Sequence, residues 1–348
     1  MLTISNSSFV KYPTELFFGI LYNSEEDTIG FPFVSPIQGE WGQPTTTSFL
    51  LEDEYPIPGF VDTIYLSIVE RAFYSIESKI QKDRIEEFSK IVDDSTGEPL
   101  FEQMVVGLAP YGGVSLWLYG QKKEVLVEWI KGECVDVTMS EFMPQIPGLT
   151  LDSLCDYYIE NDKRVGENFK RNGLPPRDLF DNYMKQFTYR YQVFFEHWNE
   201  DEEKWIKHNE EEEELIPEFD YIEESLYDGT HDKLHDGGLM KYHQAGKPKK
   251  LRVEWHIGKS EYSAYFWFED ERIREVFDRF YGAHPDTKTD FIIRIDAAKR
   301  KYELALYRYG LKEPQVIPED VYQLLVFKNK FEDYRSDNYN QERGAWIW

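Results

Sequence analysis

The strongest constraint on the fold is an order of predicted elements that occurs twice in the chain. Residues 61–120 have the pattern of strand, strand, helix, strand, strand, and residues 251–310 repeat this order over the same length. The aligned stretches share residues and both end on Tyr-Gly: Tyr74, Ser75, Arg84, Ile85 and Glu87 match Tyr262, Ser263, Arg272, Ile273 and Glu275. Such self-similarity indicates a repeated unit. We therefore predict an α+β fold with two antiparallel hairpin-helix-hairpin (ββαββ) units in pseudo-repeat, joined by a helical pair and an acidic loop.

The stretch MVVGLAPYGGVSLWLYG, residues 104–120, raises the question whether its central glycines hold a phosphate. A phosphate-binding loop needs glycines where backbone N–H groups converge, and it normally precedes a helix. Here predicted strands lie on both sides of the glycines, and the corresponding turn of the second copy, DAAKRK, has none. The sequence therefore predicts a hairpin turn.

Between the two copies, the spacing of apolar residues changes from two to 3.6 residues, which is typical of helices. Thr150 is suited to cap a first helix, whose apolar stripe is Leu151, Leu154, Cys155, Tyr158 and Ile159. Pro175-Pro176 is suited to the first turn of a second helix, whose stripe is Leu179, Tyr183, Phe187, Tyr191, Phe194 and Trp198. Because Cys155 lies on such a stripe, we predict an inert packing residue.

Residues 200–228 hold 14 Asp and Glu residues against two lysines, a local charge of −12. Like charges at this density oppose compaction, so we predict a solvated loop or a frayed helix, in which Glu210–Glu214 stay mobile in water. We predict four parts: a β-rich unit with the first copy (1–148), the helical pair (149–198), a flexible acidic linker (199–250), and the second copy with an aromatic tail (251–348).

The charge balance restricts the class of partner. The formal net charge of −26 repels phosphate backbones and anionic lipid, so we expect no nucleic acid and no membrane partner. Cys134 and Cys155 form no CxxC motif, which excludes a disulfide framework and a thiolate zinc site. The start lacks the pattern of a signal peptide, and no apolar run reaches membrane-spanning length. We therefore expect a cytoplasmic protein.

Residues that could carry chemistry are few. His231, His235 and His243 lie near Asp232 and Asp236, but Gly229, Gly237 and Gly238 argue against a helix that would align them as metal ligands. A polar linker is the favoured interpretation, and a metal site is the alternative. The motifs GxSxG and HExxH and a Cys-His signature are missing, and carboxylate pairs among 65 acids are not specific. We predict no enzyme activity, no cofactor and no metal.

Three stretches resemble a known family: FEQMVVGLAPYGGVSLWLYG, YLSIVERAFYSIESKI and LPPRDLFDNYMKQFTYRY are similar to the bacterial domain-of-unknown-function family 2931 over roughly residues 10–200. The shared motif is structural, so the resemblance implies no catalytic residue. Some members are lipoproteins and some are encoded beside secreted antibacterial toxins, which implies an immunity protein. Because this chain lacks a signal peptide and a lipidated cysteine, the resemblance implies a toxin that acts in the cytoplasm.

We therefore expect a cytoplasmic immunity protein that blocks the basic active-site face of a cognate toxin, such as a type VI secretion effector. The alternatives are an enzyme without a readable signature and a structural or adaptor protein of a secretion system. The acidic segment would speed association, and aromatic residues would anchor the complex, unless they pack on their own domain. The tail either packs on the core or forms a binding edge. The candidate partner-binding residues are Trp205, Glu210, Glu211, Glu212, Glu213, Glu214, Tyr221, Trp346 and Trp348.

Overall fold

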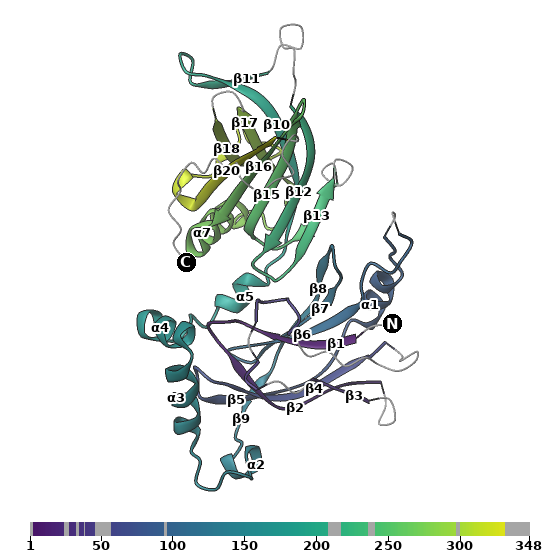
Figure 1. Ribbon diagram of the computed structural model, residues 1–348, viewed down its shortest axis with the longest axis vertical. Coiled ribbons are helices and arrows are strands. Elements are labelled where there is room, and N and C mark those ends of the chain that lie inside the picture. Colours follow the sequence, from purple (N-terminus) through teal and green to yellow (C-terminus); the bar gives the residue numbers. More distant parts are fainter. Residues whose placement is uncertain are drawn as a thin grey trace. The chain divides into compact units, whose positions relative to one another are not determined.

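The structure is a computed structural model. It describes residues 3–23, 28–32, 35–37, 39–45, 57–93, 96–207, 217–235, 241–296 and 300–330. The chain divides into two compact units, whose elements are labelled in Figure 1. Unit 1 comprises Met1–Met184 and Asp228–Thr230, and unit 2 comprises Lys185–Tyr227 and His231–Trp348.

Unit 1 is built on two groups of hydrogen-bonded strands. The first group runs in the order β1 (Thr3–Ser8), β6 (Gln103–Ala109), β7 (Gly113–Tyr119) and β8 (Glu124–Lys131). The second is a five-stranded sheet in the order β3 (Thr28–Gly30), β2 (Thr14–Tyr22), β4 (Phe60–Ser67), β5 (Ala72–Lys79) and β9 (Glu133–Val135). Strand β1 is parallel to β6, whereas the neighbours within the second group are antiparallel. Helix α1 (Lys82–Ser89) connects β5 with β6.

The two faces of the five-stranded sheet pack against different partners because successive side chains of a strand point to opposite sides. Val61 and Tyr65 of β4 join the apolar core that both groups of strands share. Ile64 and Leu66 point the other way and pack, with Phe73 of β5, against three helices. These helices are α2 (Met139–Phe142), α3 (Leu151–Asn161) and α4 (Lys163–Asn172) (Figure 1). The unit is therefore a sandwich with one helix-covered outer face.

The first predicted helix of the central region is confirmed. Its predicted cap is also present, since Thr150 Oγ1 accepts a hydrogen bond from the Ser153 backbone N at 3.2 Å. Cys155 is fully buried among the apolar residues that α3 and α4 share with the sheet, as its position on the stripe predicts.

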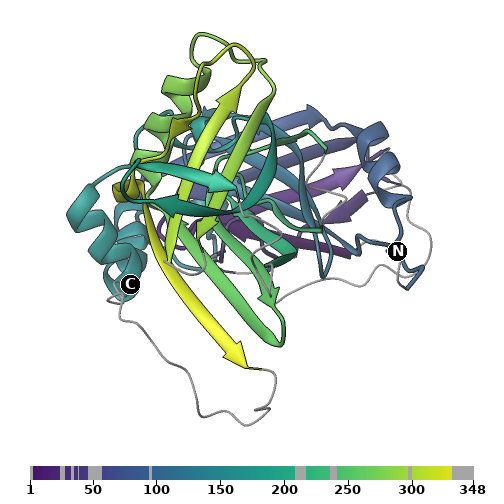
Figure 2. The ribbon, with the colours of Figure 1, turned by 90° about the horizontal axis from the view of Figure 1, so that it is seen from above.

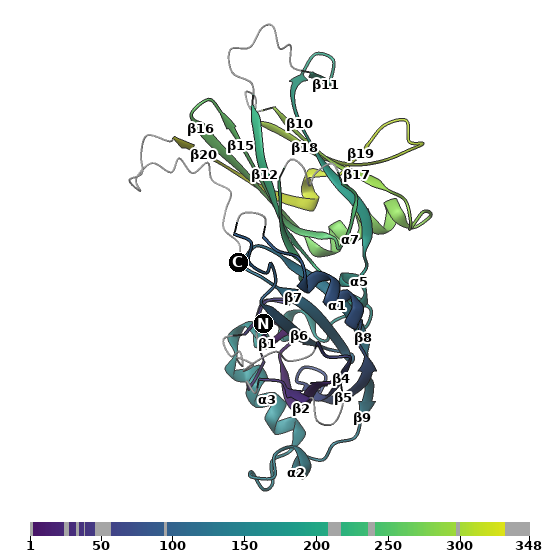
Figure 3. The ribbon, with the colours of Figure 1, turned by 90° about the vertical axis from the view of Figure 1, so that its right-hand side faces the viewer.

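Unit 2 also contains two sheets. One runs β13 (His231–His235), β12 (Glu218–Leu226), β15 (Pro248–Ile257), β16 (Ser260–Phe268) and β20 (Tyr322–Lys330). The other runs β11 (Lys204–Lys207), β10 (Phe187–Asn199), β17 (Thr289–Asp296), β18 (Lys301–Arg308) and β19 (Gln315–Val316), with β14 (His243–Ala245) paired to β10. Strands β15, β16 and β20 lie side by side (Figure 2 and Figure 3). Helix α7 (Asp270–Tyr281) packs into the core between the sheets, with Phe277 fully buried.

Part of each unit has the same order of helices and strands along the chain. The series β4, β5, α1, β6, β7 corresponds to β15, β16, α7, β17, β18. The strand orders β1-β6-β7-β8 and β3-β2-β4-β5-β9 have the same form as β10-β17-β18-β19 and β13-β12-β15-β16-β20, apart from β11 and β14, which also pair with β10. The pairs β1–β6 and β10–β17 are both parallel. Two pairs of aligned positions have matching places. Tyr74 and Tyr262 are each the third residue of their strand, β5 and β16, and Ile85 and Ile273 are buried in α1 and α7. The fold is thus mixed α and β, with strands predominating.

Two predictions for the central region are wrong. The second helix of the predicted pair (149–198) is limited to α5 (Leu179–Tyr183), and its C-terminal half is strand β10. Phe187 and Tyr191 are four residues apart, a spacing that suits one face of a helix and one face of a strand equally. In the structure Tyr189 is buried as well, so the period is two.

The predicted flexible linker (199–250) contains strands β11 to β14 and the start of β15. Strand formation is compatible with its charge because Ile222 and Leu226 of β12 enter the core, while Glu223 pairs with Arg252 and Glu224 accepts a hydrogen bond from Tyr191.

The predicted hairpin turn is confirmed. Strands β6 and β7 pair in antiparallel fashion, with Ala109 opposite Gly113. Tyr111 and Gly112 between them have φ values of 60° and 73°, in the left-handed region that tight hairpin turns require. The glycine-rich centre of this stretch therefore reverses the chain.

Candidate functional site

The first candidate anchor, Trp205, lies in a hairpin formed by β11 and the end of β10. It stands directly across from Trp198, and the two indole rings meet edge to face with centroids 5.5 Å apart. The Lys301 ammonium lies 3.6 Å from the centroid of the Trp198 ring. Trp205 therefore packs on its own hairpin and remains only partly buried.

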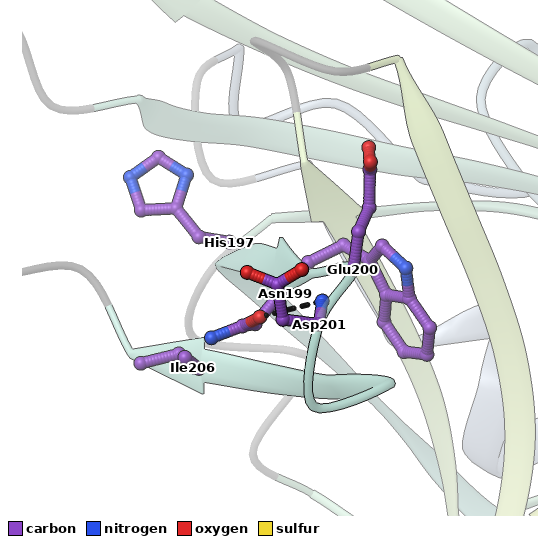
Figure 4. A pocket seen from close by; sticks show the side chains of 6 residues that line it. His197, Asn199, Glu200, Asp201 and Ile206 are labelled. Atoms are coloured by element: carbon purple, nitrogen blue, oxygen red, sulfur yellow. Dashed lines mark hydrogen bonds between the residues drawn. The ribbon is translucent and has the colours of Figure 1, made fainter.

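The tip of this hairpin is acidic. Glu200, Asp201, Glu202 and Glu203 follow β10 directly, and all four are exposed. The backbone N–H groups of Asp201 and Glu202 donate to Asn199 Oδ1 at 3.0 and 3.1 Å, which fixes the start of the turn. An open hollow beside the tip is lined by His197, Trp198, Asn199, Glu200, Asp201 and Ile206 (Figure 4). We call Glu200–Glu203 the acidic tip.

A buried carboxylate is hydrogen-bonded to the strand that leads into the acidic tip. Asp296 of β17 is fully buried, and it accepts a hydrogen bond from the Trp198 backbone N at 2.8 Å. His197 Nδ1 lies 3.8 Å from the same carboxylate, which is longer than a hydrogen bond. The described geometry therefore gives Asp296 a structural role in holding the hairpin.

The second candidate anchor, Tyr221, lies on the other sheet of unit 2, in β12. The centroid of its ring is 3.5 Å from Lys233 Nζ and 5.7 Å from Arg252 Cζ. Burial, together with a hydrogen bond to Glu254, raises the pKa of the Tyr221 hydroxyl. Arg252 itself forms ion pairs with Glu223, at 3.3 Å, and with Glu254.

Further aromatic residues continue this side of the sheet into β16. Tyr265 and Trp267 stack with centroids 5.4 Å apart and an interplanar angle of 13°. Lys250 Nζ lies 5.3 Å from the Tyr265 ring and 6.0 Å from the Trp267 ring. The members of this surface, which we call the aromatic–cation face, are Tyr221, Lys233, Lys250, Arg252, Tyr265 and Trp267. The sequence analysis found only Tyr221. A usable signal for the others is that Lys250 and Arg252, and likewise Tyr265 and Trp267, are two residues apart in strands and therefore lie on one face of the sheet.

The three histidines considered as metal ligands are not brought together. His231 Nε2 lies 3.7 Å from a Glu223 carboxylate oxygen, whereas His243 Nε2 lies 3.6 Å from Glu224. Since neighbouring residues of a strand face opposite sides, His231 and His243 lie on opposite sides of the sheet. His235 is paired with Tyr221 in the strand register. Within the described ranges, no group of three or more His, Cys, Asp or Glu residues is arranged to hold a metal ion.

Seven of the predicted site residues cannot be placed. Glu210–Glu214, Trp346 and Trp348 lie outside the described residues. Among the helices that the structure describes, none combines the length and apolar composition needed to cross a bilayer.

Comparison with known proteins identifies one family. Residues 6–176 match the model of a family described as "Protein of unknown function (DUF2931)". No curated protein and no solved structure matches the chain.

Proposed function

We propose, from the match of residues 6–176 to the DUF2931 family model, that the protein is a cytoplasmic immunity protein that binds and neutralises a cognate antibacterial toxin. The proposed toxin is a basic effector of a type VI secretion system, and the proposed mode of inhibition is the blocking of its active-site face. The observation that carries the proposal is the acidic tip of the β10–β11 hairpin.

The acidic tip supports the proposal through its charge. Its four consecutive carboxylates are exposed on a chain with a net charge of −26. A field of this sign attracts a basic protein before contact, and at physiological salt it acts over about 8 Å. Toxins that act on nucleic acid or nucleotides present basic clefts, so a matching acidic projection would both steer and cover them.

The aromatic pair beside the tip supplies the short-range part of the proposed contact. Trp205 is only partly buried, and its ring is already oriented by Trp198. Tryptophans held in place in this way lose little conformational entropy on binding, and they are frequent among residues that dominate binding energy. We therefore assign long-range attraction to the acidic tip and complex lifetime to Trp205.

The test compares two variants that remove the same charge. The first is Glu200→Gln/Asp201→Asn/Glu203→Gln at the tip. The control is Glu133→Gln/Asp136→Asn/Glu160→Gln, at exposed positions of unit 1. The toxin encoded beside the gene is the probe, and association is followed at low and at high salt. The tip variant should associate about tenfold more slowly at low salt, with little change at high salt.

A variant of Trp205 tests the aromatic contact, and a cell assay tests protection. Trp205→Ala should speed dissociation at both salt concentrations, whereas Tyr309→Ala, at a 99% exposed aromatic residue, should not. The wild-type protein should also protect cells that express the toxin. Failure to protect, or equal effects of the tip and control variants, would exclude the proposed function of the tip.

We also propose that unit 2 is a diverged second copy of the unit 1 fold. The shared order of elements, the shared strand orders and the two parallel strand pairs support the proposal. An experimental structure tests it directly: residues 61–120 and 251–310 should superpose strand on strand. If they do not, the repeat is rejected.

A further inference from the structure

We infer that the aromatic–cation face of unit 2 is a docking surface for an amphipathic helix of a partner protein, with acidic residues flanking the apolar stripe of that helix. The inference rests on a comparison of equivalent sheet faces and on the charges of the face. It does not depend on the proposed toxin, and it concerns a different sheet from the one that carries the acidic tip.

The equivalent face of unit 1 shows how a helix can lie on this side of the sheet. Strands β4 and β5, which correspond to β15 and β16, turn Ile64, Leu66 and Phe73 outward, and helices α3 and α4 pack on them. Acidic residues of α3 meet a cation from the β4–β5 turn, since Asp152 and Asp156 form ion pairs with Arg71 at 2.9 and 2.5 Å. The elements of such a contact are thus an apolar stripe and flanking carboxylates.

In the described part of unit 2, no helix packs on the corresponding face of the sheet. The residues of the aromatic–cation face do not belong to the core cluster of unit 2, and Trp267 is 38% exposed. Helix α7 packs into the core between the two sheets instead. Within the described part of unit 2, this side of the sheet therefore has no counterpart of α3 and α4.

The charges of the face select the kind of helix. Arg252 is paired with Glu223 and Glu254, whereas the ammonium groups of Lys233 and Lys250 lie over aromatic rings. The face therefore carries three cations against two carboxylates, on a chain whose net charge is −26. Carboxylates of a docked helix would form ion pairs with Lys233 and Lys250, whereas these two lysines would repel the lysines of a basic helix.

The rings of the face provide the apolar contact. The stacked pair Tyr265–Trp267 presents a flat platform on β16, next to the edge strand β20. Tyrosine, tryptophan and arginine are the residues most enriched where a few side chains carry most of the binding energy. Long-range repulsion by the whole chain should slow the approach of an acidic helix, so added salt should speed its association. This salt dependence is opposite to that expected at the acidic tip.

The test uses two synthetic helical peptides with the same apolar stripe, one flanked by glutamate and the other by lysine. Binding is measured by fluorescence anisotropy with the full chain carrying Glu200→Gln/Asp201→Asn/Glu203→Gln, because the acidic tip would itself attract the lysine peptide. The glutamate peptide should bind at least about tenfold more tightly than the lysine peptide. Trp267→Ala and Lys250→Glu should each weaken its binding about tenfold, whereas Tyr309→Ala should leave it unchanged. Lys250→Glu leaves both rings of the Tyr265–Trp267 stack in the protein, so it tests the face even where Trp267→Ala fails to fold.

Three results would overturn the inference. The first is equal binding of both peptides, or binding that neither Trp267→Ala nor Lys250→Glu weakens. The second is a concentration-dependent increase in the mass of the free protein that Trp267→Ala abolishes, which would assign the face to a second copy of the chain. The third is a gain of about tenfold in peptide affinity on Trp346→Ala/Trp348→Ala, which would assign the face to the chain's own C-terminal segment.

Discussion

Glu223 and Glu224 are adjacent in β12, and their carboxylates face opposite sides of the sheet. Glu223 pairs with Arg252 on the side of the aromatic–cation face. Glu224 is 1% exposed, and it accepts a hydrogen bond from the Tyr191 hydroxyl at 2.6 Å. One step along the chain thus separates a surface ion pair from a buried polar network. Each of the two carboxylates has a partner on its own side of the sheet, which is how this acidic stretch is accommodated in a strand.

The hydrogen bond from Tyr191 to Glu224 should contribute measurably to stability. A buried carboxylate that loses a donor keeps its desolvation cost, so Tyr191→Phe should lower the free energy of unfolding by about 2 kcal/mol. Urea denaturation measures the change, with Tyr307→Phe as the control at a partly exposed tyrosine. In the background of Glu224→Gln the cost of Tyr191→Phe should shrink. An equal cost in both backgrounds would show that the hydroxyl acts independently of Glu224.

The turn between β6 and β7 should require glycine for two separable reasons. Gly112 has a φ of 73°, and a Cβ there would lie 2.7 Å from the Gly132 carbonyl oxygen. Gly97 has a φ of 72° but nothing within 4 Å of such a Cβ. Gly97→Ala should therefore cost about 1 kcal/mol from the backbone alone, and Gly112→Ala about 2 kcal/mol more from the close approach. Similar losses in thermal or urea unfolding would contradict the steric explanation.

Local patterns predicted the hairpins well because their pairing is short-range. The turn at Tyr111–Gly112 and the helix cap at Thr150 depend on residues only a few positions apart. Strand β10 shows the limit of such patterns. Its spacing at Phe187 and Tyr191 fits both periods, and its strand form depends on pairing with β17, about a hundred residues later in the chain.

The candidate surfaces were predictable only in part for the same reason. Tyr221 stands out in the sequence as an aromatic residue among charges. Its contacts with Lys233 and Arg252 arise from the register of β12 with β13 and β15, which no local pattern specifies. Trp205 also stands out, but its packing on Trp198 depends on a hairpin in a segment whose charge predicted a loop. Single residues were found, whereas the surfaces they form were not.

The two cysteines should react very differently. Cys134 lies exposed in β9, whereas Cys155 is fully buried in the core shared with α3 and α4. Burial raises the pKa of the Cys155 thiol to about 12, so its thiolate is scarce at neutral pH. A thiol-specific reagent should therefore modify one cysteine in the native protein and the second only after unfolding. Mass spectrometry of Cys134→Ser and Cys155→Ser identifies each site, and rapid native labelling of Cys134→Ser would contradict the prediction.

Glu124, at the start of β8, is the buried carboxylate with the clearest consequence for pH dependence. It is 4% exposed, and it accepts a hydrogen bond from Gln43. Burial raises its pKa to about 7, against a smaller opposing effect of Gln43. The folded protein therefore binds a proton at Glu124 more tightly than the unfolded chain does, and this favours folding at low pH.

The stability that protonated Glu124 contributes should be fully present below pH 4.5 and should be lost as pH rises through about 7. A shift of this size corresponds to about 3 kcal/mol. Glu124→Gln keeps the shape of the protonated side chain but cannot ionise, so it should flatten the fall in stability over this range and should leave the variant more stable than wild type at pH 8. Glu133→Gln, at an exposed carboxylate of β9, is the control and should keep the wild-type slope. Urea denaturation at a series of pH values measures the effect. If wild type and Glu124→Gln lose stability in parallel, the carboxylate is not protonated in the folded protein.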